Sequence, residues 1–325
     1  MDLLIVEPLE PEVVQWLDVR YRVRYAPRLA LEPLALRRAL YDVRAMIIPP
    51  SVAVDAAVLQ AAPLLRAIGR LSSGAERIHL EACTRAGVEV IRPEDASAQA
   101  EAEFAIGAML QLLRRVPVVN AEGLLVGREL GSATVGIVGL TPGARVLTKL
   151  LSTFGAEVVG YDPGLHGSDP LWAEWGVRPL GLRELIAGSD VVCVLLNYTS
   201  RFRGLIGERY LASCKPQQVL VSLVHTNVFD ERALAEALSS GRMAAAWFDS
   251  MEPGMLDNGR PMHGVTNLQI TPRVASTTRE SRLRSAWSVA LRIDALLSGA
   301  DTTPDEFRQV SRAGAVDPED VPGSG

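Results

Sequence analysis

The sequence predicts an α/β fold of two doubly wound domains, each a parallel sheet with helices on both faces. The chain has 325 residues, more than one hydrophobic core normally organises, so two domains are expected. Short apolar runs alternate with helical periods in two series, one in residues 1–97 and one from Thr134 to Pro272. That alternation is typical of βαβ units.

The composition favours a folded protein that handles small molecules. Hydrophobic residues make up 48% and charged residues 22% of the chain, which excludes disordered, collagen-like and disulfide-framework proteins. The 33 basic and 38 acidic residues give a net charge of -5, and this balance gives nucleic-acid binding no electrostatic support.

The cysteines and the N-terminus favour a cytoplasmic protein. Cys83, Cys193 and Cys214 are odd in number and far apart, so we expect neither a disulfide framework nor a metal site. The first apolar run, Leu3 to Val6, is interrupted by Glu7 and Pro8. We therefore expect neither a signal peptide nor a membrane span.

The first series contains four expected strands and a long helix. The strands lie in DLLIVEP, VRAMIIPP, LLRAIGRL and VEVIRPE, and helices are expected near residues 10–17, 31–41 and 54–61. From residue 98 to 116 apolar residues keep a helical period that only Gly107 interrupts. This helix is expected to link the two domains.

The second series forms a complete sheet by itself. Its six expected strands lie in TVGIVGL, AEVVGYDP, DVVCVLL, QVLVSLV, MAAAWFDS and NLQITP. An amphipathic helix is expected over 277–297, followed by a tail rich in Pro, Gly, Asp and Ser. The expected boundaries are 1–97 for the first part, 98–275 for the nucleotide domain, 276–300 for a returning helix and 301–325 for the tail.

A Gly-rich turn follows TVGIVGL and opens a dinucleotide-type βαβ unit. Gly139 permits the tight turn, and Asp162, 23 residues later, ends the next strand. Backbone N–H groups at the helix start would face a pyrophosphate, and a carboxylate at Asp162 favours the ribose of NAD over NADP. Thr141 replaces the middle glycine of the usual pattern and Pro142 removes an N–H donor, so a turn without ligand remains the alternative.

Over nearly its whole length the sequence resembles the D-isomer-specific 2-hydroxyacid dehydrogenases. The resemblance covers AIGRLSSGAERIHLEACTRAGVEVIRPEDASAQAEAEFAIGAML, GIVGL with AEVVGYDP, SDVVCVLLNYTSRFRGLIG, LVSLVHTNVFDERALAEAL, AAAWFDSMEP and NLQITPRVASTT, in the family's order and spacing. It implies a Rossmann-type coenzyme domain inserted into a flavodoxin-like substrate domain, with a cleft between them. It also implies a homodimer formed through the coenzyme domains.

The resemblance implies an NAD(H)-dependent oxidoreductase for a 2-hydroxy acid and 2-keto acid pair. The implied substrate-binding residues are Ser72, Ser73 and Gly74, in a loop that is otherwise an ordinary strand-to-helix turn. The implied cofactor-binding residues are Gly139, Thr141, Pro142, Gly143, Ala144, Asp162, Pro163, Asn197, Val224 and Asp249.

The catalytic positions differ from those of the family. The family uses an Arg for the substrate carboxylate, a His as acid and base, and a Glu that holds the His protonated. Reduction of a keto acid needs such a proton donor and a fixed cation. Here the Arg position is His225, the His position is Arg273 and the Glu position is Gly254.

Two interpretations of this change remain open. In the first, the Arg and His have exchanged places, with His225 as acid and base, Arg273 on the carboxylate and Glu252 replacing the missing acid. In the second, the site has decayed to a non-catalytic NAD-binding sensor or scaffold, which Thr141 and Pro142 favour. His225 would then be a strand-end polar residue satisfied by backbone.

Overall fold

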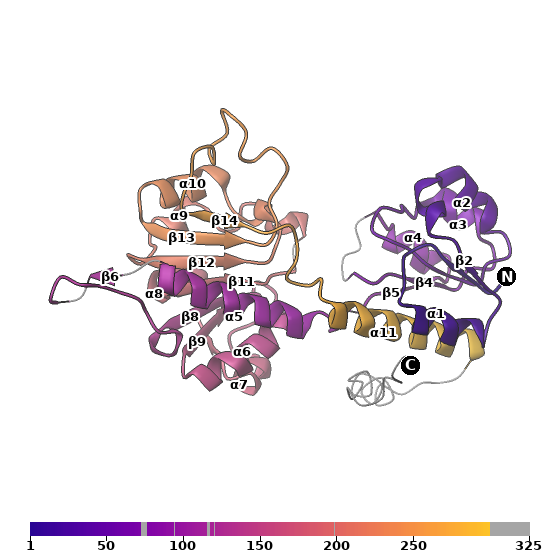
Figure 1. Cartoon of the computed structure of the whole chain (residues 1–325), viewed down its shortest axis with the longest axis horizontal. Helices are drawn as coiled ribbons and strands as arrows, with labels where there is room; N and C mark the ends of the chain where they lie inside the picture. Colours follow the sequence, from indigo (N-terminus) through magenta and orange to yellow (C-terminus); the bar gives the residue numbers. More distant parts are fainter. Residues whose placement is uncertain (73–76, 94, 116–117, 120, 198, 300–325) are drawn as a thin grey trace, which may run out of the picture. The chain divides into compact units, whose positions relative to one another are not determined.

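The computed structural model describes residues 1–72, 77–93, 95–115, 118–119, 121–197 and 199–299 (Figure 1). The chain divides into two compact units: unit 1 is Met1–Ser97 with Arg279–Gly325, and unit 2 is Ala98–Thr278. Each unit has a parallel sheet with helices around it, so the predicted fold class is confirmed. Unit 2 is thus an insertion in the sequence of unit 1.

Unit 1 contains a five-stranded parallel sheet in the order β2-β1-β3-β4-β5. This is the strand order of flavodoxin-like sheets, in which the connections reverse direction between the first and third strands. The strands are β1 (Leu3–Ile5), β2 (Val23–Tyr25), β3 (Ala45–Ile47), β4 (Ala67–Gly69) and β5 (Glu89–Ile91).

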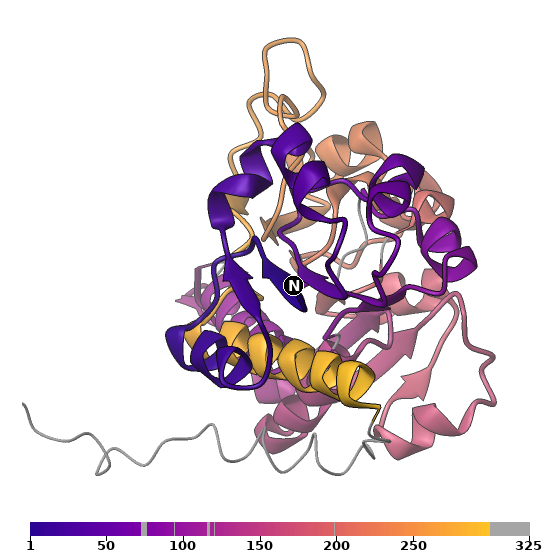
Figure 2. The same ribbon diagram turned by 90° about the vertical axis from the view of Figure 1, so that its right-hand side faces the viewer.

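Two helices close together cover one face of this sheet (Figure 2). α1 (Pro11–Asp18) buries Val13 and Leu17, and α11 (Arg279–Ser298) buries Val289 and Ile293 in the same apolar cluster. A Cβ on Gly69 would lie 2.3 Å from the Val289 Cγ1 atom. The return helix therefore packs directly on β4 and completes this face.

The remaining helices of unit 1 include the one expected near residues 31–41. They are η1 (Pro27–Leu31), α2 (Pro33–Ala39), α3 (Ala56–Ala61) and α4 (Leu80–Arg85). The helix expected near 31–41 is α2, and Pro33 begins it at a position where its missing N–H costs nothing. The 3-10 helix η1 before it was not expected.

Unit 2 contains a seven-stranded parallel sheet in the order β10-β9-β8-β11-β12-β13-β14. The connections reverse direction between β8 and β11, so the carboxyl ends of these strands form the edge where such sheets bind ligands. The strands are β8 (Thr134–Val138), β9 (Glu157–Tyr161), β10 (Arg178–Pro179), β11 (Val191–Val194), β12 (Gln218–Ser222), β13 (Met243–Phe248) and β14 (Leu268–Ile270).

Helices enclose both faces of this sheet. On one face, Met109 and Leu112 of α5 (Ala98–Arg115) pack with Leu147 and Leu151 of α6 (Pro142–Phe154). The helix expected to link the domains therefore lies wholly in unit 2, because this apolar side is buried against α6. The other helices of the unit are η2 (Leu130–Ser132), α7 (Pro170–Glu174), α8 (Leu182–Gly188), η3 (Ser200–Phe202), α9 (Glu208–Leu211), η4 (Thr226–Val228) and α10 (Glu231–Ser239).

An antiparallel hairpin extends from unit 2 beyond the end of α5 (Figure 1). It consists of β6 (Val118–Val119) and β7 (Leu125–Val126). Val119, Leu124 and Leu125 are 63%, 61% and 71% exposed. These apolar side chains remain uncovered within the single chain.

Within the described residues, no helix is both long and apolar enough to cross a membrane.

Candidate active site

The turn after β8 requires glycine at its first position. Gly139 has φ of 99°, in the left-handed region that favours glycine. A Cβ there would lie 2.5 Å from the Leu196 Cα atom and 2.6 Å from its backbone nitrogen. The turn thus holds the strand end of β8 directly against that of β11.

The N-terminus of α6 retains donors for an anion although Thr141 and Pro142 alter the motif. Thr141 caps the helix, with its Oγ1 accepting from the Ala144 backbone N–H at 3.3 Å, and Pro142 has the first-turn position that tolerates proline. Thr141 and Gly143 lie at the start of the helix, where backbone N–H groups have no acceptor within the helix. A phosphate group fits at such a helix start.

Asp162 holds this turn and remains able to bind a ribose. Its Oδ2 accepts from the Leu140 N–H at 2.8 Å, and its Oδ1 accepts from the Gly164 N–H at 2.7 Å. Each carboxylate oxygen has further acceptor capacity for a ribose hydroxyl. The neighbouring Tyr161 hydroxyl has a raised pKa, chiefly because it is buried and also because Tyr210 and Asp162 lie near it.

Glu101 on α5 lies beside the start of α6, a position that the sequence analysis did not anticipate. A Cβ on Gly143 would lie 2.6 Å from the Glu101 Oε2 atom, so Gly143 leaves room for this carboxylate at the start of α6. The sequence contained a signal, since Glu101 shares a helical face with the buried residues Ala105, Ala108 and Leu112. A carboxylate on a buried stripe indicates a specific contact.

His225 follows β12 and pairs with Glu252, which follows β13. The His225 Nε2 atom contacts Glu252 Oε1, while His225 Nδ1 accepts from the Asn227 backbone N–H at 3.3 Å. A neutral ring in this arrangement carries its proton on Nε2. The Glu252 backbone N–H donates to Thr226 Oγ1 at 3.3 Å, which ties the two loops together.

Arg273 follows β14 in a strained backbone conformation. Its φ is 57°, which is uncommon for a residue other than glycine and marks candidate functional positions. Its backbone N–H donates to the Asp249 carbonyl at 2.6 Å, and its Nε donates to Ser250 Oγ at 3.3 Å.

The Asp249 carboxylate is buried and bound to the loop that carries Arg273. It is 4% exposed. Its Oδ1 accepts from Thr271 Oγ1 at 2.7 Å and the Val274 N–H at 2.9 Å, and its Oδ2 accepts from the Ala275 N–H at 2.9 Å. The resemblance implies that Asp249 binds the cofactor, and in the structure its carboxylate also fixes the conformation of residues 271–275.

His225, Glu252 and Arg273 lie at one edge of the sheet. Their strands β12, β13 and β14 are parallel neighbours, and both His225 and Arg273 contact the segment from Ser250 to Glu252. Gly254, at the family's Glu position, has φ of 77° and forms a turn. The acidic partner of the histidine is therefore Glu252.

The other expected site residues have varied surroundings. Asn197 is exposed, Pro163 and Ser72 are half-buried, and Val224 packs against the apolar cluster of unit 2. Ser73 and Gly74 lie outside the described residues.

The thiols offer no nucleophile at this edge. Burial raises the pKa of Cys193, and chiefly burial raises that of Cys214 to about 11, so neither forms a thiolate readily at neutral pH. In the described part of the chain, no group of three or more His, Cys, Asp or Glu side chains is arranged to hold a metal ion.

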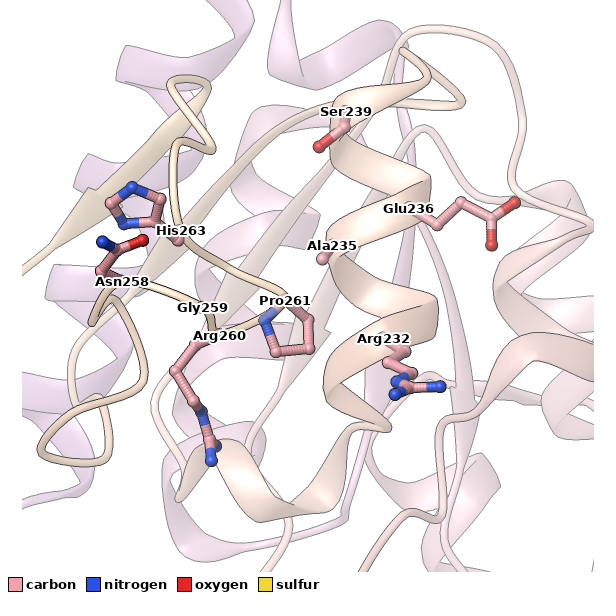
Figure 3. A pocket seen from close by; sticks show the side chains of 9 residues that line it. All are labelled: Arg232, Ala235, Glu236, Ser239, Asn258, Gly259, Arg260, Pro261 and His263. Atoms are coloured by element: carbon pink, nitrogen blue, oxygen red, sulfur yellow. The ribbon is translucent and has the colours of Figure 1, made fainter.

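An open groove of about 660 Å³ lies elsewhere in unit 2, between α10 and residues 258–263 (Figure 3). Arg260 pairs there with Glu231. Figure 3 shows Arg232 and Arg260 pointing away from His263. The polar groups do not converge on one ligand, so the strand ends remain the candidate site.

Comparison with known proteins identifies the family. Residues 106–275, more than half of the chain, match the D-isomer specific 2-hydroxyacid dehydrogenase, NAD binding domain. The chain belongs to this family. NAD is accordingly the cofactor, and the glycine turn, the start of α6 and Asp162 fit it.

Two curated relatives resemble this dehydrogenase family member along most of its length. D-3-phosphoglycerate dehydrogenase of Mycobacterium tuberculosis is 30% identical over 98% of this chain and 60% of the relative. The chain thus spans about 60% of that relative's length. (S)-sulfolactate dehydrogenase of Chromohalobacter salexigens is 29% identical over 88% of this chain and 95% of the relative.

A solved relative shares the fold. The structure of D-lactate dehydrogenase from Aquifex aeolicus complexed with NAD and lactic acid has a TM-score of 0.73 and 21% identity, and the match covers 92% of this chain and 96% of that one.

Proposed function

We propose that this protein is an NAD(H)-dependent oxidoreductase for a 2-hydroxy acid and 2-keto acid pair, with the family's Arg and His roles exchanged. His225 is the acid and base, Glu252 orients it, and Arg273 binds the substrate carboxylate. The observation that supports this proposal is the His225–Glu252 pair beside the segment that also contacts Arg273. If the family's Arg and His had been replaced by two unconnected changes, there would be no reason for a carboxylate to contact the histidine.

The bonds of His225 define its proton transfer. In the neutral ring, Nε2–H donates to Glu252 and Nδ1 accepts from the Asn227 N–H at 3.3 Å. When Nδ1 binds a second proton, the bond from Asn227 is lost and Nδ1 becomes a donor. During reduction this proton moves to the carbonyl oxygen while the carbonyl carbon gains a hydride. Bound NADH supplies that hydride. The Glu252 carboxylate stabilises the imidazolium that precedes the transfer.

Arg273 supplies a fixed cation for the substrate carboxylate. A guanidinium can bind a carboxylate through two parallel hydrogen bonds. Asp249 holds the loop 271–275 through three hydrogen bonds, so the backbone that carries Arg273 is fixed before substrate binds. Ser72, Ser73 and Gly74 are proposed to bind the substrate through backbone and hydroxyl donors.

Asp162 is proposed to set the preference for NAD(H) over NADP(H). Its carboxylate lies at the end of β9, where it accepts from a ribose diol and repels a 2′-phosphate. Calorimetric titration should show tighter binding of NADH than of NADPH. Equal or tighter binding of NADPH contradicts this assignment.

The test of the catalytic roles uses NADH and a panel of 2-keto acids. His225→Ala should lower kcat by about 10² to 10⁴, and Glu252→Gln should lower kcat with little effect on NADH binding. Arg273→Ala should mainly raise the KM of the keto acid. His263→Ala, at an exposed loop position, is the matched control and should retain wild-type rates.

The second candidate is a non-catalytic NAD-binding protein. The observation that favours it is that both ring nitrogens of His225 already have partners in the chain, as in a purely structural histidine. A protein that binds NADH, reduces no keto acid of the panel and keeps its properties in His225→Ala fits this candidate and excludes the exchange.

The hairpin of unit 2 is proposed to bind a second copy of the chain. Its exposed side chains Val119, Leu124 and Leu125 form a contiguous apolar segment, and such segments on soluble proteins mark interaction sites.

The three cysteines are unpaired, which fits the proposed location in the reducing cytoplasm.

A further inference from the structure

Ser250 carries a buried hydroxyl at the candidate site, and the sequence pattern assigns it no role. It follows Asp249 at the carboxyl end of β13 and is 9% exposed. The strand β13 lies between β12 and β14 in the parallel sheet. Ser250 therefore lies between the loops that carry His225 and Arg273.

The Ser250 hydroxyl contacts the Arg273 side chain. Its Oγ accepts from the Arg273 Nε–H at 3.3 Å. The arginine itself is an exposed residue of the loop after β14. This bond thus ties the end of an exposed, charged side chain to a buried strand end.

The bond determines which edge of the guanidinium can face a ligand. A guanidinium donates through Nε and through both Nη atoms, so a carboxylate can accept either from Nε with one Nη or from the two Nη atoms. Ser250 occupies Nε. Within the part of the chain that the structure describes, neither Nη atom of Arg273 has a hydrogen-bond acceptor. The pair of Nη atoms is therefore the edge left for an anion.

The Arg273 residue is held at both ends. Its backbone N–H donates to the Asp249 carbonyl at 2.6 Å, and its Nε is held by Ser250. A long side chain that is free in solution loses rotamer freedom when it binds a ligand, and that loss weakens binding. The bond to Ser250 removes part of this loss before the substrate arrives.

We propose that Ser250 is a positioning residue, which holds Arg273 so that both Nη atoms bind the substrate carboxylate. This inference rests on the proposed function, because it takes Arg273 as the carboxylate ligand. Ser250 acts through Arg273 and takes part in neither the proton nor the hydride transfer. Its loss should therefore weaken substrate binding and leave the chemical step unchanged.

The experiment compares the full-length wild type with Ser250→Ala, which lacks the acceptor, and Ser250→Thr, which keeps it. Ser239→Ala, at an exposed serine that ends α10, is the matched control. The kinetic readouts are KM and kcat for the best 2-keto acid with NADH. The dissociation constant of oxamate, measured by calorimetry in the presence of NADH, gives a readout that needs no turnover.

In Ser250→Ala, KM and the oxamate dissociation constant should rise by about twofold to tenfold, as expected when one long side chain must be ordered on binding. The kcat and the affinity for NADH should stay near the wild-type values. Ser250→Thr should restore KM, and Ser239→Ala should behave as the wild type.

A double-mutant cycle with Arg273→Lys separates positioning from a general structural role. Lysine keeps the positive charge, but a methylene group replaces the Nε–H that Ser250 accepts. In this background, Ser250→Ala should change the oxamate affinity little. A general structural role of Ser250 predicts the same loss of affinity in both backgrounds.

An equal loss in both backgrounds, an unchanged KM and oxamate affinity in Ser250→Ala, or a wild type that binds no oxamate overturns the inference. Reduction of keto acids that is insensitive to Ser250 overturns it and leaves the proposed function intact. Oxamate affinity that depends on Ser250 only when Arg273 is present, in a protein without turnover, supports the inference and contradicts only the proposed catalysis.

Discussion

Asp249 stabilises an unfavourable backbone conformation at Arg273. A left-handed conformation in a residue with a side chain costs about 1 to 3 kcal/mol. Three hydrogen bonds to the buried carboxylate offset that cost. The strain at Arg273 and the burial of Asp249 thus belong to one arrangement.

Asp249→Asn should release this loop. The amide retains one acceptor oxygen, so at least one of the Val274 and Ala275 N–H groups loses its partner. We expect a loss of about 1 to 3 kcal/mol in the free energy of unfolding, measured by denaturant titration, and a higher KM for the keto acid. Asp257→Asn, an exposed aspartate, should leave both unchanged, and an unaltered Asp249→Asn variant would refute the proposed anchoring.

Glu7 should make the stability of the protein depend on pH. Its pKa is raised from 4.5 to about 7 on folding, chiefly by burial, so the folded state binds more protons between these values. Its contribution is fully present below pH 4.5 and is lost as pH rises to 7, by about 3 kcal/mol at most. The difference in unfolding free energy between Glu7→Gln and wild type should widen over this range, and a constant difference would contradict the expectation.

At the scale of single residues, the sequence could predict chemical types but not their bonds. The resemblance to the family identified His225 and Arg273 at its Arg and His positions, and it made Glu252 a candidate for the missing acid. The sequence could not show that Glu252 contacts His225, because that contact depends on how two loops leave neighbouring strands. It likewise could not show that Glu101 lies at the start of α6, or which bonds the Asp249 carboxylate accepts.

The turn between β8 and α6 is the element most sensitive to a small substitution. In Gly139→Ala the new methyl group would meet the Leu196 backbone at 2.5 Å, with φ of 99°. Backbone atoms cannot give way as a flexible side chain can. We expect a loss of at least about 2 kcal/mol in stability and a more than tenfold loss in NADH affinity, measured by denaturation and calorimetry.

Gly107→Ala on α5 is the matched control. Gly107 is exposed, and a Cβ there would meet nothing within 4 Å. The substitution should stabilise the helix by about 0.5 to 1 kcal/mol. Equal effects of the two substitutions would contradict the argument about the turn.

Of the strands in the two parallel sheets, the two that were not predicted, β2 and β10, lie at sheet edges, whereas the edge strands β5 and β14 were predicted. The β2 strand comes from VRYRVRY, where arginines interrupt the apolar pattern, and it lies at the edge of its sheet. The short strand β10 is also at an edge and contains Pro179. Edge strands need little apolar sequence because one side lacks a neighbouring strand.

At the scale of the whole molecule, the hairpin of unit 2 should control the oligomeric state. Leu125 is 71% exposed, so Leu125→Asp should leave the folded chain intact and weaken association. We expect the wild type to sediment as a dimer and the variant to shift toward the monomer in analytical ultracentrifugation. A monomeric wild type at micromolar concentration, or an unchanged dimer in the variant, excludes the hairpin as the interface.

The insertion of unit 2 into unit 1 has a consequence for how the protein is made. A ribosome completes the five strands of unit 1 before it starts residue 98, but α11, which packs against Gly69 of β4, emerges only after residue 279. Until then α1 alone covers that face of the sheet, while unit 2 already has every strand and helix it needs. Unit 2 should therefore reach its native state first during translation. Residues 1–97, although made first, should be the last to become resistant to protease.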